Sequence, residues 1–273
     1  MRRISLALAT AALALGVVAC GGDDEPAASS SPDAPLVVGA SPVPHAEILN
    51  FIKDNLAEKN GLKLEVKEFT DYVLPNTALV DGQLDANYFQ TPAYLAEQEQ
   101  SRNFKATSVV GVHIEPLGLY SRKVTDINAI PDGAQIAIPN DPTNEARALR
   151  LLAANKLITL NDNQSTTATI RDITDNPKNI DFAEVEAAQT PRSLDDADLA
   201  VINGNYAIEA DLTPSEDALV LEQGEGNPNA NLLVTLPDER SDPRVKKLAE
   251  LLTSPEVKQF IDDNYKGAVL AAF

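Results

Sequence analysis

The chain has little of what redox, nucleophilic and metal chemistry require. Its 273 residues include one cysteine, two histidines, one methionine and no tryptophan. One cysteine cannot form a disulfide within the chain, and a reactive thiol would have to lie inside a folded site. The sequence has no GxSxG or HExxH motif and no acid/base pair that stands out. We therefore predict no catalytic residue, no metal and no cofactor. A secreted hydrolase stays open as an alternative.

Basic residues are also scarce. The chain carries 22 Lys and Arg against 41 Asp and Glu, a formal net charge of −19. Loss of Arg2 and Arg3 with a leader would bring the charge to −21. Such a surface repels phosphate backbones and anionic lipid headgroups. We therefore expect no nucleic-acid partner and no direct adhesion to acidic membranes.

The one cysteine, Cys20, closes an N-terminal segment with the features of a secretory signal. Arg2 and Arg3 precede an apolar run over residues 4–19 that is too short to span a bilayer comfortably. The ending Val-Val-Ala-Cys resembles the lipobox of bacterial lipoproteins, in which the cysteine is acylated and becomes the first mature residue. Residues 1–19 are thus the predicted signal peptide and Cys20 the predicted lipidation site. The alternative is that Cys20 is only a small apolar residue of the leader.

A polar linker follows the cysteine. Residues 21–35 read GGDDEPAASSSPDAP, a composition that buries almost nothing and cannot offset the entropy of ordering. We expect residues 20–35 to form a disordered, lipid-anchored linker with a root-mean-square span of about 20 Å. The remaining 238 residues, from 36 to 273, suffice for one large or two ordinary domains.

Beyond the linker, apolar extended runs alternate with amphipathic stretches. Residues 36–40, LVVGA, are typical of a strand buried on both faces. A helical stretch begins at Pro44 and ends at Gly61. Further strands are predicted at residues 62–69, 106–112, 117–121, 135–139, 180–185, 199–202 and 232–236, with helices between most of them and at 242–252 and 255–265. The alternation predicts an α/β fold with parallel sheets.

Proline and asparagine positions suggest two lobes. Pro116 separates two apolar extended runs where a central strand would not tolerate it, so the chain is expected to cross there to a second lobe. A return crossing fits near Asn231, where NPNAN gives way to LLVTL. The predicted lobes are residues 36–115 plus 232–273, and residues 116–231.

The densest aromatic cluster is a candidate for a ligand cleft. It contains Phe69, Tyr72, Tyr88, Phe89 and Tyr94. In α/β sheets, residues at strand ends and in the following turns line the crevice where ligands bind. Ordinary core packing is the alternative, and for Phe69 it is the preferred interpretation. The turn-rich surroundings of Tyr72 and Tyr94 favour the cleft.

A second candidate is the segment PNDPTNEARALRLL at residues 139–152. A strand ends there, a polar turn with Asn140 and Asp141 follows, and Arg147 lies in the first turns of a helix. Free N–H groups at a helix start attract anions, and a guanidinium can bind a carboxylate through two parallel hydrogen bonds. The turn and helix start therefore predict a carboxylate receptor. The equal alternative is a surface arginine paired with Glu145 or Asp141.

Three asparagines form a third candidate group. Asn203 directly follows a predicted buried strand, Asn205 lies beside Gly204, and Asn231 precedes LLVTL. An asparagine amide can accept from an ammonium and donate to a carboxylate, which suits a zwitterion. Service in a turn is the simpler interpretation for Asn205.

The two histidines are interpreted as structural. His45 is a candidate for facing the cleft from a helix start, and His113 for a hydrogen bond at the crossing between lobes. Neither stands at metal-ligand spacing from a cysteine or carboxylate.

These segments, in this order, resemble the NlpA-type family of methionine-binding lipoproteins of bacterial ABC importers. The likeness runs from about residue 36 to residue 268 and is carried by VGASPVPHAEIL, DYVLPN, LDANYFQ, VHIEPLGLYS, IPNDPTNEARAL, NPKN, PRSLDDADLAVIN and the final helices. It implies a two-lobed periplasmic-binding-protein fold of type II-like architecture, each lobe a sheet flanked by helices. It also implies closure on a free amino acid in the interlobe cleft and delivery to a permease driven by an ATPase.

The resemblance assigns roles to polar residues. Arg147 is similar to the residue that binds the ligand carboxylate, and Asn203 and Asn231 are similar to the pair around the ligand's polar end. Asn140 completes the polar part of the predicted site.

It also assigns an aromatic clamp for a thioether, formed by Tyr72, Phe89 and Tyr94. Thr91 stands where many members have histidine in Phe-Gln-His, which changes the side-chain pocket.

The resemblance implies a monomer held at the outer face of the bacterial cytoplasmic membrane through the Cys20 lipid alone. Its expected partners are a small zwitterion, methionine foremost, and an ABC permease with its ATPase. L-methionine, D-methionine, a methionyl dipeptide and another apolar amino acid stay open as ligands. A structural surface lipoprotein is the remaining alternative.

Overall fold

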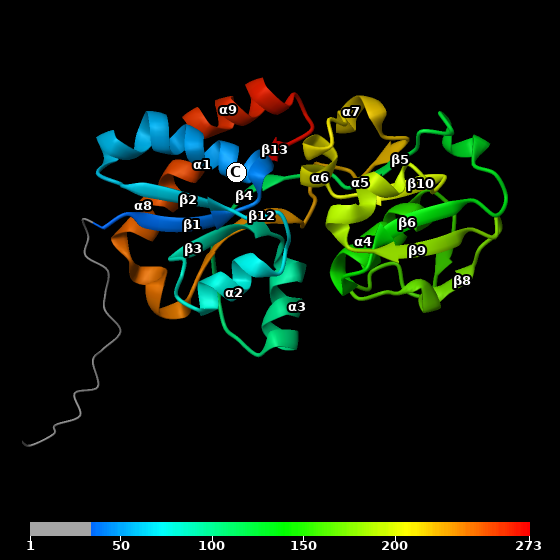
Figure 1. Cartoon of the computed structure of the whole chain (residues 1–273), viewed down its shortest axis with the longest axis horizontal. Helices are drawn as coiled ribbons and strands as arrows, with labels where there is room; N and C mark the ends of the chain where they lie inside the picture. The colour runs from blue at the N-terminus through cyan, green and yellow to red at the C-terminus, as the bar shows by residue number, and fades with distance from the viewer. Residues whose placement is uncertain (1–33) are drawn as a thin grey trace, which may run out of the picture. The chain divides into compact units, whose positions relative to one another are not determined.

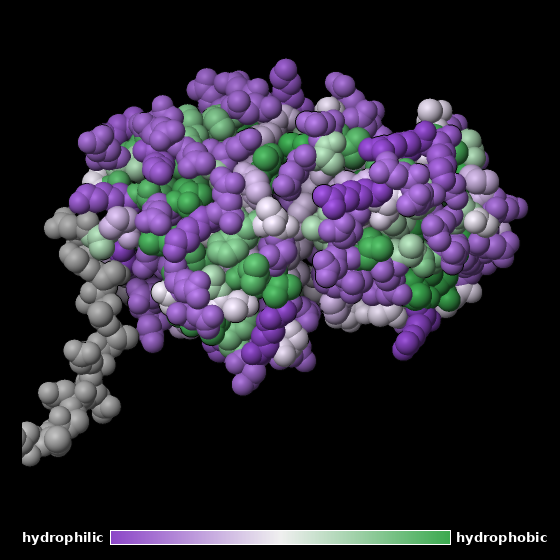
Figure 2. Space-filling view, viewed as in Figure 1, coloured by the Kyte–Doolittle hydropathy of each residue, from purple (hydrophilic) through white to green (hydrophobic). Residues whose placement is uncertain are grey.

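The computed structural model describes residues 34–273. The predicted signal peptide, Cys20 and all but the last two residues of the predicted linker lie outside this range. None of the helices in the described range has the length and apolarity that a membrane crossing needs. Polar side chains cover most of the face shown in Figure 2, as the charge predicts.

The first of two main sheets has six strands in the order β13-β4-β12-β3-β1-β2 (Figure 1). Its strands are β1 (Leu36–Ala40), β2 (Leu64–Glu68), β3 (Ala86–Gln90), β4 (Thr107–Ile114), β12 (Ala230–Thr235) and β13 (Leu270–Ala271).

The second main sheet has five strands in the order β11-β5-β10-β6-β9. Its strands are β5 (Gly118–Tyr120), β6 (Gln135–Pro139), β9 (Asp181–Val185), β10 (Leu199–Ile202) and β11 (Val220–Leu221). A small separate ladder joins β7 (Thr159–Leu160) to β8 (Ile173–Asp175).

Helices cover both sheets, because each helix has an apolar stripe that packs into a core. Buried residues of α1 (Glu47–Ile52), α8 (Pro243–Leu252) and α9 (Pro255–Tyr265) share one core with the six-stranded sheet. The helices α2 (Leu74–Val80) and α3 (Pro92–Arg102) share a second core on that sheet. The five-stranded sheet packs with α4 (Pro142–Ala154) in one core and with α6 (Gly204–Glu209) in another.

Short helical turns complete the described elements. They are η1 (Pro42–Ala46), η2 (Lys53–Ala57), η3 (Glu58–Asn60), η4 (Ile127–Ala129), η5 (Ile170–Asp172), η6 (Ala187–Gln189), α5 (Thr190–Ser193), α7 (Pro214–Asp217) and η7 (Pro237–Ser241).

The α/β class is confirmed, but the prediction of parallel sheets is wrong in part. β1 runs parallel to β2 and β3, and β6 runs parallel to β9 and β10. β12 is antiparallel to both β3 and β4, and β5 is antiparallel to β10. The reason is topological: β12 returns from the second sheet at the end of the first sheet where β4 leaves it.

The strands predicted at 135–139 and 199–202 have the predicted bounds in the structure. β3 was not predicted as a strand because Asn87 and Gln90 interrupt its apolar pattern. Both amides are buried and bonded to each other and to Asn76, which lets polar residues lie in a fully buried strand.

Two segments connect the sheets. Residues 115–117 lead from β4 to β5, and residues 222–229 lead from β11 to β12. β12 begins at Ala230, two residues before the predicted return at 232. The division into lobes at 36–115 plus 232–273 and at 116–231 stays a prediction.

Candidate functional site

A cavity lies between the two sheets. Its lining comes from both sheets and from the first connecting segment. The residues are Tyr72, Phe89, Gln90, Thr91, Tyr94, Glu115, Asn144, Arg147, Asn203, Gly204, Asn205 and Asn231. The cavity thus brings together seven of the eight residues predicted to bind ligand. Their contact with a ligand stays a prediction.

The eighth residue, Asn140, lies outside this cavity. It lines an outer cleft that shares Tyr72 and Tyr94 with the inner cavity. Asn140 directly follows β6 and precedes Asp141, the N-cap of α4. Asp141 accepts the Asn144 backbone N–H at 3.0 Å, so the polar turn predicted from the sequence serves chiefly to start the helix that carries Arg147.

Three aromatic rings form one wall of the cavity. The ring centroids of Tyr72, Phe89 and Tyr94 lie 5.8–6.1 Å from one another. The Tyr94 hydroxyl donates to the Tyr72 backbone carbonyl at 3.0 Å. Of the other clustered aromatics, Tyr88 is fully buried in the core and Phe69 packs against a core on the same sheet. The expectation that Tyr88 lines the crevice is therefore wrong.

Local backbone interactions place this wall. Phe89 lies near the end of β3, and Thr91 follows as the N-cap of α3, where its hydroxyl accepts from the Tyr94 N–H at 3.5 Å. Asp71 accepts the N–H groups of Val73 and Leu74 at 2.7 and 2.8 Å and so fixes the turn that presents Tyr72.

Tyr72 also joins the two sheets. Its hydroxyl donates to Asn205 Oδ1 at 2.5 Å, and its ring lies 5.0 Å from that of Tyr206. The Tyr206 hydroxyl in turn donates to the Thr70 carbonyl at 3.3 Å. Burial raises the pKa of Tyr72 well above its usual value, so its hydroxyl stays a donor at neutral pH.

Arg147 is buried, with 6% of its surface exposed. It is not paired with Glu145 or Asp141, as the alternative interpretation had it. Its Nε and Nη2 donate to the two carboxylate oxygens of Glu222 at 2.7 and 2.5 Å, and Nη2 also donates to the Glu115 carbonyl at 2.8 Å. Burial alone would lower the pKa of Arg147, but Glu222 raises it above its usual value. The Nη1 group makes no hydrogen bond with any described residue, so it remains for a ligand.

The asparagines present further groups without partners. Asn203 Nδ2 donates to Asn144 Oδ1 at 2.9 Å, whereas Asn203 Oδ1 and Asn205 Nδ2 are buried and have no partner within the described residues. Asn231 Oδ1 lies 3.0 Å from His45 Nε2. Buried polar groups are normally hydrogen-bonded, so a free acceptor and a free donor beside one cavity point to a polar ligand.

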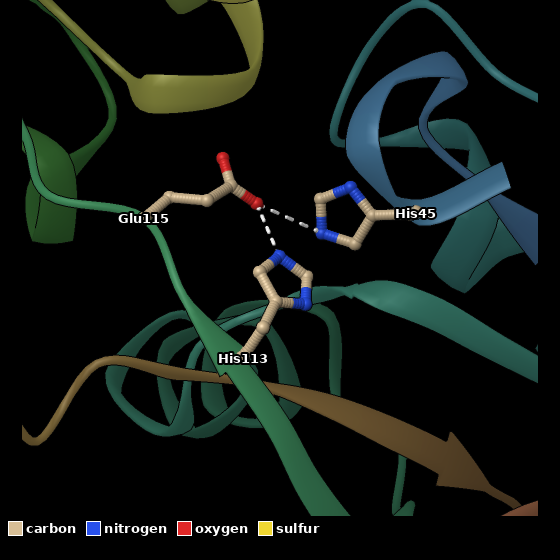
Figure 3. Close-up of side chains that lie close together, drawn as sticks. All are labelled: His45, His113 and Glu115. Carbon is tan, nitrogen blue, oxygen red and sulfur yellow. Dashed lines mark hydrogen bonds and ion pairs between the residues drawn. The ribbon is translucent and has the colours of Figure 1, made fainter. Parts of the chain in front are cut away.

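The two histidines lie together with Glu115 (Figure 3). Glu115 Oε1 is 2.6 Å from His113 Nε2 and 3.3 Å from His45 Nε2. The Tyr88 hydroxyl bonds His113 Nδ1 on the far side of that ring. Sequence spacing did not predict this cluster: Glu115 is only two residues from His113, but His45 reaches it through the fold.

Burial controls the charges of this cluster. It lowers the pKa of His45 to about 4 and that of His113 to about 3, so both rings are neutral at pH 7. Burial also raises the pKa of Glu115, partly offset by the charge of Arg147 and by the hydrogen bond from the Asn205 N–H.

Glu115 and Glu222 are two charged residues of the site that the sequence reasoning missed. Glu115 had a usable signal, because an acid in the apolar extended segment VHIEPLGLYS is unusual. Glu222 had none, since it meets Arg147 across 75 positions of sequence.

Two sheets joined by two segments, with a polar and aromatic cavity between them, define a substrate-binding protein of the two-lobed class. Residues 36–273 match the NlpA lipoprotein family, and the chain belongs to that family. The D-methionine-binding lipoprotein MetQ of Escherichia coli is 38% identical over 258 residues, which cover 94% of this chain and 93% of that protein.

Solved structures of similar proteins agree with this assignment to the family. A nutrient-binding protein from Burkholderia cenocepacia, bound to methionine, is 43% identical with a TM-score of 0.84, covering 87% of this chain and all of that one. A periplasmic substrate-binding protein of an ABC transporter from Coxiella burnetii is 41% identical with a TM-score of 0.83, covering 87% of this chain and all of that one.

Proposed function

We propose that this protein captures a free amino acid, methionine foremost, and delivers it to an ABC importer. The observation that supports this proposal is a cavity lined both by three aromatic rings and by a buried arginine whose Nη1 has no hydrogen-bond partner among the described residues. Tyr72, Phe89 and Tyr94 suit a thioether side chain, because sulfur and ring edges attract by about 0.3 to 1.5 kcal/mol. The names of the E. coli and B. cenocepacia relatives support methionine as the first ligand to test.

In this proposal Arg147 binds the ligand carboxylate through Nη1, because Glu222 already occupies the Nε/Nη2 edge. Asn203 and Asn231 lie beside the ligand's polar end, and Thr91 borders its side chain. Asn140 lies at the outer cleft, where a dipeptide or a longer side chain would extend. The lobes, 36–115 plus 232–273 and 116–231, would then close around the ligand.

The test is a thermal-shift screen of the full lipoprotein in mild detergent against all amino acids, D-methionine and methionyl dipeptides. A ligand at about 100 times its dissociation constant adds about 2.7 kcal/mol of stability. We expect methionine to give a shift among the largest of the panel. A screen in which no amino acid or dipeptide shifts the transition would reject the proposal.

We further propose that the protein acts as a monomer at the outer face of the cytoplasmic membrane, held by an acyl group on Cys20. Its partners there would be the permease and ATPase of an ABC importer, as the name of the C. burnetii relative suggests. Cys20→Ala should leave the leader uncleaved or release the protein from membranes, while ligand binding persists. Membrane fractionation and N-terminal mass spectrometry measure both. A normally processed, membrane-bound variant would rule out the anchor.

A further inference from the structure

Three buried amide side chains form a closed hydrogen-bond network beside the cavity. Asn76 lies on α2, Asn87 and Gln90 lie on β3, and each is at most 2% exposed. Asn76 and Gln90 share two hydrogen bonds, from Asn76 Nδ2 to Gln90 Oε1 at 2.9 Å and from Gln90 Nε2 to Asn76 Oδ1 at 2.8 Å. Asn87 joins both, since its Nδ2 donates to Asn76 Oδ1 and its Oδ1 accepts from Gln90 Nε2, each at 2.9 Å. The network therefore links a helix to the end of a strand.

The amides of this network are satisfied by one another rather than by a ligand. Gln90 lines the cavity, whereas Asn76 and Asn87 are not among its lining residues. Both amide protons of Gln90 are already donated within the network, so it has no free N–H for a ligand. Asn87 uses its second proton on the Pro75 carbonyl at 3.3 Å. Any effect of Asn76 and Asn87 on a ligand therefore has to pass through the residues that they position.

Two aromatic residues of the cavity are direct neighbours of the network. Tyr72 lies in the turn immediately before α2, and Phe89 directly precedes Gln90 on β3. The centroids of the two rings are 6.1 Å apart. The Asn76 amide ties the first turn of α2 to β3, where the helix and the strand lie side by side (Figure 1). Because hydrogen bonds are directional, the network constrains how the two rings lie relative to each other.

Strand pairing alone gives this end of β3 incomplete support. β1 pairs with β3 only as far as Tyr88. On the other side, the pairing with β12 changes register opposite the last three residues of β3. Phe89 has no paired residue in either ladder. The side-chain network therefore holds Gln90 at the point where the backbone ladder is irregular.

Stability alone does not account for three amides at this place. A buried, hydrogen-bonded amide adds little net stability, because it gives up hydrogen bonds with water when it is buried. Apolar side chains of the same shape can replace such a set with almost no loss of stability. What hydrogen bonds add is a single defined arrangement, since apolar surfaces can slide over one another and a satisfied polar network cannot.

We propose that Asn76, Asn87 and Gln90 are positioning residues that fix the rings of Tyr72 and Phe89 relative to each other, and hence the side-chain shape that the aromatic wall accepts. The inference rests on the proposed function and deepens it, because it names residues that decide between unbranched and branched side chains. Methionine and norleucine are unbranched, whereas leucine branches at Cγ. Asn76 and Asn87 exert this selection without lining the cavity.

The test compares Asn87→Leu with the parent, as full lipoproteins in mild detergent, against L-methionine, L-norleucine and L-leucine. A leucine side chain has the branched shape of asparagine without its hydrogen bonds. We expect the ratio of methionine affinity to leucine affinity to fall about three- to tenfold, because the rings lose their fixed arrangement. The ratio of norleucine affinity to leucine affinity should fall with it. Isothermal titration calorimetry, by displacement for the weaker ligands, measures the affinities.

Asn176→Leu is the matched control, because the substitution is the same and also removes side-chain hydrogen bonds. Asn176 lies between β8 and β9, outside the cavity lining, and bonds the Ile180 N–H and carbonyl, both at 2.9 Å. This variant should lose stability and keep both affinity ratios. Asn87→Ser retains a polar group beside Gln90 and serves if Asn87→Leu does not fold, with an expected fall in the ratio of at least about twofold. Circular dichroism and the melting temperature report folding.

An unchanged ratio of methionine to leucine affinity in Asn87→Leu, or in Asn87→Ser where Asn87→Leu does not fold, would make the network purely structural. That result would overturn the inference, while the proposed function would stand. An equal fall in Asn176→Leu would also overturn it, since the effect would then follow from lost stability. If the parent binds no amino acid, the proposed function is rejected, and the inference with it.

Discussion

The aromatic wall of the cavity differs from its polar wall, which contains Arg147 and Asn203, in how many of its polar groups are hydrogen-bonded before a ligand binds. Tyr72 and Tyr94 have both hydroxyls hydrogen-bonded and their rings in mutual contact with Phe89. The polar wall keeps Arg147 Nη1 and Asn203 Oδ1 without partners among the described residues. A wall whose polar groups are already hydrogen-bonded selects ligands by their shape. A wall with unpaired polar groups selects ligands that carry the matching hydrogen-bonding groups. The polar wall should therefore decide whether an amino acid binds, and the aromatic wall which one.

The largest expected effect comes from the polar wall. Arg147→Ala leaves the ligand carboxylate desolvated and unpaired, which should cost about 3 kcal/mol or more, above a hundredfold in affinity for every amino-acid ligand. It also leaves the partly buried Glu222 carboxylate without its cation, so we expect a loss of unfolding free energy of up to about 3–5 kcal/mol. Calorimetric titration and denaturant unfolding measure the two effects.

The double variant Arg147→Ala/Glu222→Gln separates the effect on ligand affinity from the effect on stability. Removing the stranded charge should restore most of the stability and none of the binding. If the double variant binds amino acids as well as the parent, or if Arg147→Ala alone does so, the arginine has no role in recognition.

The sequence located much of this site because the relevant residues lie in contiguous segments. Asp141, in the polar turn picked out from the sequence, is the N-cap of α4, and the strand before it ends where predicted. Two interactions that set the site's charge were beyond local reasoning. Glu222 meets Arg147, and His45 meets Glu115, only because the fold brings together segments that are far apart in the sequence. Sequence spacing reports neighbours along a helix or strand, not those brought together by topology.

The same limit explains the errors in the fold. β3 contains buried amides whose partners lie 3 to 14 residues away, so a rule based on apolar runs missed a central strand. The direction of β12 follows from its return through residues 222–229, which no pattern within the strand reveals.

A smaller effect should follow from loosening the contact between the two walls. Tyr72→Phe keeps the ring but removes the 2.5 Å hydrogen bond to Asn205, leaving an amide oxygen without its donor. We expect a loss of about 1–2 kcal/mol in binding free energy, shared by all amino-acid ligands because the contact between the two sheets around the cavity is weakened. Titrations of the variant and the parent with methionine and with leucine show whether the loss of affinity is the same for both ligands.

Tyr206→Phe is the matched comparison, because its hydroxyl joins the same sheets through a longer bond of 3.3 Å to Thr70. It should weaken binding less than Tyr72→Phe does. A Tyr72→Phe variant with parental affinity would show that this hydrogen bond does not contribute to the bound state.

The smallest expected effect belongs to Thr91, and it tests the aromatic wall alone. Thr91 borders the cavity beside Phe89 and Tyr94 but also caps α3, so Thr91→His should lower stability by about 1 kcal/mol through loss of the cap. Carboxylate recognition at Arg147 should be untouched, because that group lies on the other wall. What should change is the ranking among methionine, D-methionine and other apolar amino acids, by several-fold in relative affinity.

Thr91→Ser, which keeps a capping hydroxyl, should preserve both stability and ranking. If Thr91→His lowers the affinity for every ligand by the same factor, Thr91 acts through α3 rather than through contact with the ligand's side chain. Thr91 would then not contribute to the selection among amino acids that we assign to the aromatic wall.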